Sequence, residues 1–125
     1  MATYSSVFTP AASTAGGGGE DCQKVTTLAV TTASSLLSMG TRIKFVVVVV
    51  PAVAASATPT SGANIRFTNS AVTGSTTTAS AADFMVPLNS ALTFDTGDAW
   101  NQIEFFNPNT TTGATLDIYV MRLVT

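Results

Sequence analysis

The sequence predicts an all-β protein: an antiparallel β-sandwich or jelly-roll-like barrel of seven or eight strands with an extended N-terminal arm. Three observations support this fold class. Short segments alternate between apolar and polar residues, and turn-forming residues separate them. The five consecutive valines at residues 46–50 favour a strand, because β-branched side chains suit a pleated strand better than a helix. No segment has a convincing helical period.

The chain is expected to divide into an arm at residues 1–24 and a β-sandwich domain at residues 25–125. The arm contains four consecutive glycines, which lose much conformational entropy on ordering and have no side chains to pack. The arm is therefore expected either to fold back on its own domain or to lie on a partner. We favour the partner, with the large apolar residues of the arm as anchors. These residues are Tyr4, Val7 and Phe8.

The first half of the domain predicts three or four strands. β-branched clusters at residues 24–32 predict the first strand, and residues 34–38 predict a turn or a second short strand. The valine run comes next, and Pro51 ends it because proline has no N–H to donate to a sheet. Residues 64–69 alternate cleanly, so they predict another strand.

The second half predicts four further strands, at residues 83–87, 91–95, 100–106 and 114–124. Residues 71–82 are rich in Thr, Ser and Ala and are expected to form an exposed loop. Residues 96–98 and 107–113 contain the Asp, Asn, Pro and Gly that favour turns.

Two of the expected strands, residues 45–50 and 116–123, are apolar on both faces. A two-layer sandwich buries only the inner face of each sheet, so the second apolar face needs another cover. We expect one face of the valine strand to pack in the sandwich and the other to meet the arm or a neighbouring subunit. The outward set consists of Val46, Val48 and Val50.

The charge content excludes several classes of partner. Charged residues make up 10% of the chain, against about a quarter in typical proteins, and the net charge is −2. The five basic residues form no stripe, so no nucleic-acid partner is expected. The longest apolar stretch is too short to span a bilayer, so no membrane partner is expected. A single cysteine and the absence of a signal-peptide pattern favour assembly in a cytoplasm.

The residue types also argue against catalysis, metal binding and a cofactor. The chain has no histidine, which is the commonest general base and metal ligand. Paired carboxylates for glycoside hydrolysis are conceivable among Asp95, Asp98 and Glu104. Asp95, Asp98 and a loop carbonyl could hold Ca²⁺, but a Thr-Gly turn flanked by the two aspartates explains them better. Trp100 is expected in the core or an interface, with sugar stacking as the alternative. Asn109 begins a glycosylation sequon.

The second half of the chain resembles a family of virion proteins. It reads LTFDTGD at residues 92–98, WNQIEFFNP at 100–108 and ATLDIYV at 114–120. These segments look like the terminal hairpin of small β-sandwich virion proteins of tailed bacteriophages, and the resemblance covers about residues 64–123.

This resemblance implies a capsid decoration or cement protein of the virion, without enzymatic residues and assembled in the host cytoplasm. Its partners would be the major capsid protein and further copies of itself, with a trimer favoured. The rival hypothesis is a fibre tip or adhesin that binds glycans through Trp100 and the loops at 71–82 and 107–113. A head–tail or tail subunit is a further alternative. A main coat protein is less favoured, because the arm has no basic residue before Lys24.

Overall fold

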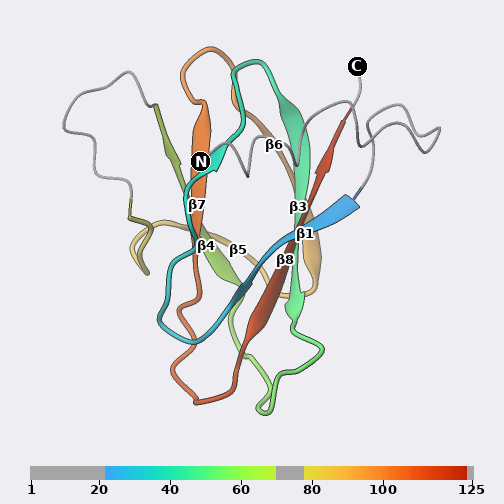
Figure 1. Ribbon diagram of the computed structural model, residues 1–125, viewed down its shortest axis with the longest axis vertical. Helices are drawn as coiled ribbons and strands as arrows, with labels where there is room; N and C mark the ends of the chain where they lie inside the picture. The colour runs from blue at the N-terminus through green and yellow to red at the C-terminus, as the bar shows by residue number, and fades with distance from the viewer. Residues whose placement is uncertain (1–21, 70–77, 124–125) are drawn as a thin grey trace.

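The computed structural model describes residues 22–69 and 78–123. The regular structure in these ranges consists of strands alone, which confirms the predicted all-β fold (Figure 1). The strands are β1 (Cys22–Leu28), β2 (Leu37–Ser38), β3 (Lys44–Pro51), β4 (Ala63–Thr68), β5 (Phe84–Val86), β6 (Ser90–Asp95), β7 (Gln102–Phe106) and β8 (Leu116–Arg122).

The described strands form two antiparallel sheets of four. One sheet has the order β1-β8-β3-β6 and is called the β3 sheet below; the other has the order β2-β7-β4-β5 and is called the β4 sheet. Figure 1 shows β4 and β7 on the left, and β1, β3 and β8 on the right. The two sheets pack face to face, so the molecule is a β-sandwich.

The strand order is that of a jelly roll. The antiparallel pairs β1·β8, β2·β7, β3·β6 and β4·β5 are nested in the sequence, as in one long antiparallel ribbon. Rolling up this ribbon brings β8 beside β3 and β7 beside β4, and both of these pairs are also antiparallel. Of the two predicted architectures, the sandwich with jelly-roll order is therefore the one present.

The core lies between the two sheets. β3 contributes Phe45, Val47 and Val49, all of which are fully buried. The β4 sheet faces them with Ile65, Ile103, Phe105 and Val86, and β8 adds Leu116, Ile118 and Val120. Every second residue of these strands points inward, as the two-residue period of a strand requires.

The valine strand separates into two faces, as predicted. The burial of β3 alternates along the strand, with the odd-numbered residues from 45 to 49 buried and the even-numbered ones half-buried or exposed. Val46, Val48 and Val50 therefore lie on the outward face of the β3 sheet. The predicted boundary at residue 25 falls inside β1, because pairing with β8 already begins at Cys22.

Several predicted strands are shorter in the structure, and two of their ends show why. Residues 29–32 leave the sheet, because Thr31 has a positive φ of 54° and its N–H donates to Asn107 O (2.8 Å) instead of to a strand. The strand predicted from Trp100 begins only at Gln102, because Trp100 N–H donates to Thr96 O (3.3 Å) within a turn.

One end of the sandwich is closed by a network around Asn107 and Asn109. The fully buried Asn107 amide donates to Leu28 O (2.9 Å) and Ala114 O (3.0 Å), and its Oδ1 accepts the N–H (3.0 Å) and Nδ2 (2.8 Å) of Asn109. Asn109 in turn binds the backbone of Ser61 through both amide atoms. Three connections far apart in the sequence are thereby tied together, and the buried amides are satisfied.

The two faces of β3 give a matched pair of variants. Val47→Ala removes two methyl groups from the core and is expected to lower the free energy of unfolding by about 2–3 kcal/mol. Val48→Ala makes the same chemical change on the half-buried outward face and should cost about 1 kcal/mol or less. Equal losses in urea denaturation would contradict the assignment of the two faces.

Candidate functional site

The outward side chains of β3 and β8 form one apolar surface. The strand register places Val46 opposite Met121 and Val48 opposite Tyr119. These four side chains and Val50 are all half-buried. We call this set of five residues the outer valine face. It joins two strands that are about 70 residues apart in the sequence, and so it exists only in the folded sheet.

A buried carboxylate marks one end of the outer valine face. Asp117 lies opposite Val50 on β3 and opposite Thr27 on β1. Its side chain is buried, and its Oδ1 accepts a hydrogen bond from Thr27 Oγ1 (2.6 Å). A buried carboxylate without partners would be costly, so the hydroxyl of Thr27 stabilises this arrangement. The apolar surface therefore ends at a fixed polar group.

The structure brings together half of the predicted contact residues. Val46, Val48 and Val50 lie together on the outer valine face, as predicted. The other three predicted residues, Tyr4, Val7 and Phe8, lie outside the described residues. The sequence indicated that Tyr119 and Met121 turn away from the core, but it did not indicate that they lie beside the valines. That fact depends on the pairing of β3 with β8.

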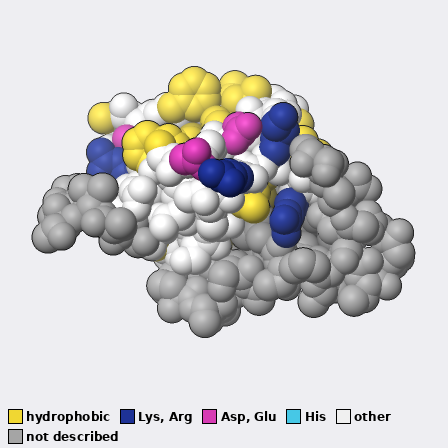
Figure 2. All heavy atoms as spheres, turned by 90° about the horizontal axis from the view of Figure 1, so that it is seen from above, with side chains coloured by type: hydrophobic (Ala, Val, Ile, Leu, Met, Phe, Trp, Pro, Cys, Tyr) yellow, Lys and Arg dark blue, Asp and Glu magenta, His cyan; other side chains and the backbone are white. Residues whose placement is uncertain are grey.

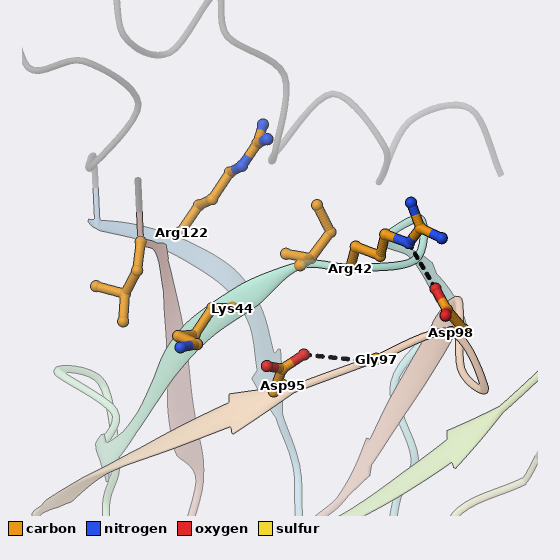
Figure 3. A pocket seen from close by; sticks show the side chains of 8 residues that line it. Arg42, Lys44, Asp95, Gly97, Asp98 and Arg122 are labelled. Carbon is orange, nitrogen blue, oxygen red and sulfur yellow. Dashed lines mark hydrogen bonds and ion pairs between the residues drawn. The ribbon is translucent and has the colours of Figure 1, made fainter. Parts of the chain in front are cut away.

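A charged hollow of about 530 Å³ lies at the end of the sandwich opposite the Asn107 network (Figure 3). The turn before β3, the start of β3, the turn after β6 and the end of β8 line it. Its charged residues come from these four places: Arg42, Lys44, Asp95, Asp98 and Arg122. Three of the five basic residues of the chain therefore gather at one end.

Two local interactions shape the rim of the hollow. Arg42 Nε donates to Asp98 Oδ1 (2.6 Å), and Asp95 Oδ1 accepts the N–H of Gly97 (2.8 Å). Both Arg42 and Asp98 are highly exposed, so water screens their ion pair and it contributes little to stability. The hollow is thus a solvated surface of mixed charge, with one more basic than acidic side chain among the residues that line it.

An aromatic cluster lies beside this end of the sandwich. Phe67 is at its centre, with ring centroids 5.5 Å from Phe94, 6.3 Å from Phe45 and 6.2 Å from Trp100. Phe84 contacts Phe94 edge-on, with a centroid distance of 6.2 Å. Trp100 is 42% exposed and Phe84 62% exposed. Figure 2 shows hydrophobic side chains gathered next to acidic and basic ones at this end.

The three carboxylates that the sequence grouped lie in different surroundings. Asp95 binds the N–H of Gly97 two residues later, which confirms the interpretation of a turn. Asp98 pairs with Arg42, and Glu104 is buried in the β4 sheet. Within residues 22–69 and 78–123, His, Cys, Asp and Glu form no group of three that could hold a metal ion.

Glu104 belongs to a polar cluster on the outward face of the β4 sheet. Its carboxylate accepts the N–H of Ala79, and it lies opposite Arg66, which pairs with Asp83 (3.2 Å). Burial raises the pKa of Glu104, and the Ala79 hydrogen bond and the charge of Arg66 oppose this rise only in part. Ala79 is buried against this cluster, so the predicted exposure of residues 71–82 is wrong at this position.

The sequon residue is not accessible to a glycosylating enzyme in the folded chain. Asn109 is buried, and its Nδ2, to which a glycan would be attached, donates to Ser61 O (2.8 Å) and Asn107 Oδ1 (2.8 Å). A glycan at this position would break the Asn107 network. The sequon match is therefore explained by the structural role of Asn109.

Comparison with known proteins assigns the chain to no family. The chain matches no protein-family model, and no curated protein or solved structure matches it. Among the described residues, no helix has the length and apolar character that a membrane span requires.

The buried Glu104 predicts a pH-dependent stability. A raised pKa means that the folded state binds the proton of Glu104 more tightly than the unfolded chain does. The free energy of unfolding therefore falls as the pH rises above 4.5, the ordinary pKa of a glutamate side chain. Glu104→Gln keeps an acceptor for the N–H of Ala79 and removes the buried charge. We expect this variant to be more stable than the original protein at neutral pH, with a difference that shrinks as pH falls towards 4.5.

Urea denaturation over this pH range measures the effect. Asp98→Asn is the matched control, because it removes an exposed carboxylate and should change stability by less than about 1 kcal/mol. A Glu104→Gln variant that is less stable at neutral pH, by an amount that does not vary with pH, would contradict the prediction.

Proposed function

We propose that this protein is a structural virion protein that binds and stabilises an assembled phage capsid, as a decoration or cement protein without catalytic activity. The observation that carries the proposal is the outer valine face on a sandwich of jelly-roll order. Jelly rolls form viral capsid domains, but they also form lectins and cupins, so the fold by itself does not decide the function.

The chemistry of the outer valine face suits a protein partner. It combines three valines with Tyr119 and Met121, and it carries no charge within the set. The cores of protein interfaces are depleted in charge and enriched in aromatic residues and methionine. The partner in this proposal is the major capsid protein, with the virion as the location.

Stabilisation of a shell needs affinity and no catalyst. A protein that binds the assembled lattice but not the free subunits shifts the equilibrium towards the lattice by mass action. The β3 sheet offers a stiff surface for this purpose, because β3 and β8 are each paired on both sides. A rigid surface loses little conformational entropy on binding.

The double variant Val46→Thr/Val48→Thr tests the proposal. Threonine has nearly the shape of valine and keeps the β-propensity, but it replaces a methyl group with a hydroxyl on the outer valine face. We expect the variant to fold and to bind reconstituted phage shells about tenfold more weakly in co-sedimentation. The original protein should raise the disruption temperature of the shells, and the variant should raise it less.

Val53→Thr is the matched control, because Val53 is 96% exposed in the loop that follows β3, is not part of the outer valine face, and should be neutral. The proposal is wrong if the original protein neither co-sediments with shells nor raises their disruption temperature. If it binds and the double variant binds equally well, the outer valine face is not the contact surface.

A glycan-binding module is the second candidate function, and the exposure of Trp100 favours it. The indole is 42% exposed, it is supported by Phe67, and it lies in the turn that also carries Asp98 of the charged hollow. An exposed aromatic ring beside polar groups is a suitable platform for a sugar ring.

A glycan array separates the two functions. If the protein binds glycans, the original chain should give signals on the array, and Trp100→Ala should abolish them. If the protein is a decoration protein, neither the original chain nor the Trp100→Ala variant should give a signal on the array. Phe84→Ala is the matched control, because it truncates another exposed ring of the same aromatic cluster outside the turn of the hollow.

A further inference from the structure

We infer that two copies of this chain pair edge to edge through β6, as an antiparallel two-fold dimer centred on Thr93. The inference concerns self-association, so it does not rest on capsid or glycan binding. It follows from a comparison of the four sheet edges, from the backbone groups that β6 leaves unused, and from the register in which β6 complements itself.

Of the four edges of the sheets that the described strands form, three are poor sites for adding a strand. In the β4 sheet, β2 has two residues, and β5 has three and is followed by Pro87. In the β3 sheet, the register of β1 is irregular between Lys24 and Thr26. Short strands, proline and bulges all discourage edge pairing. β6 has six residues in regular register with β3, and it lacks these protections.

The ladder between β3 and β6 shows which backbone groups remain available. Thr96 N–H donates to Ile43 O (2.9 Å) directly after the last residue of β6. Because antiparallel ladders alternate, the residues of β6 that bond to β3 are 90, 92 and 94. The intervening residues direct their N–H and C=O groups away from β3, and all three are exposed: Ala91, Thr93 and Asp95.

A second β6 fits this edge in one self-complementary register. In this register Thr93 lies on the two-fold axis and faces Thr93 of the partner subunit. Ala91 then faces Asp95 of the partner subunit. The three residues with available backbone groups then meet one another, and each pair can exchange two hydrogen bonds. Thr–Thr pairs are favourable in sheets, and no like charges lie opposite each other.

The same register also brings the aromatic cluster of one subunit beside that of the other. Leu92 faces Phe94 of the partner subunit on the inner side of the joined sheet. Leu92 and Phe94 are only half-buried in one copy, and Phe84, whose ring contacts Phe94, is 62% exposed. A dimer through β6 would place this apolar side of the sandwich against its own copy. Exposed aromatic groups at one edge are typical of such an interface.

The symmetry of this contact gives a different oligomer from the trimer that the resemblance implied. A contact in which the same strand meets itself is isologous and closes as a dimer. A strand from another protein is the other possible occupant of the edge, and it would leave the isolated chain monomeric. The mass of the full chain in solution therefore distinguishes these cases.

Charge substitutions at Thr93 provide a specific test, because any charge at the two-fold axis meets its own copy. Thr93→Lys alone and Thr93→Asp alone should each weaken dimerisation by roughly 100-fold or more, since like charges are then directly opposed. An equimolar mixture of the two variants should restore the dimer, because lysine then faces aspartate. Sedimentation velocity of the full-length chain measures all three samples.

Thr58→Lys and Thr58→Asp are matched controls at an exposed loop position and should remain dimeric. Circular dichroism checks that each variant is folded, and a variant that fails this check is replaced by Ala91→Asp, which places a like charge opposite Asp95 of the partner subunit on the same edge. The inference is supported if the original protein is dimeric, each Thr93 variant alone is monomeric, and the equimolar mixture of the two variants is dimeric. A monomeric or trimeric original protein, or single variants that dimerise as tightly as the original, would overturn it.

Discussion

The position of β3 inside its sheet is the constraint on which the rest of the structure depends. β3 is paired with β8 on one side and with β6 on the other, so its backbone is satisfied by two neighbours. Its odd-numbered residues fill the core, and its even-numbered residues create the outer valine face. The same pairing brings β8 beside the valines and leaves β6 as the edge of the sheet. The core, the proposed capsid contact and the proposed dimer edge thus all follow from one strand.

The two ends of the sandwich differ in character. At one end, the buried amides of Asn107 and Asn109 hold three connections together through satisfied hydrogen bonds, which favours a single arrangement. At the other end, the exposed Arg42–Asp98 pair and the ring of Trp100 meet solvent. Fixed connections at one end and exposed functional groups at the other are typical of binding modules on a rigid scaffold.

The three surfaces of the molecule are suited to different partners. The outer valine face is broad and uncharged, which suits another protein. The edge of β6 offers backbone hydrogen bonds and is complementary to itself. The end with the aromatic cluster combines rings with charged groups, which suits a polar ligand. The outer valine face is formed by β3 and β8, whereas the aromatic cluster shares Phe94 with β6, so a dimer through β6 also changes the surroundings of that cluster.

The sequence by itself determined the fold class, most strand positions and the two faces of the valine strand. These features depend on local patterns, namely β-branched runs, a two-residue period and turn residues such as Asp95 and Gly97. Only the tertiary structure decided which strands are neighbours. It placed Tyr119 beside Val48, moved the start of β7 to Gln102, and gave Asn107 and Asn109 their structural roles. The physical reason is that strand pairing and buried hydrogen bonds join residues far apart in the chain, and no local pattern records their partners.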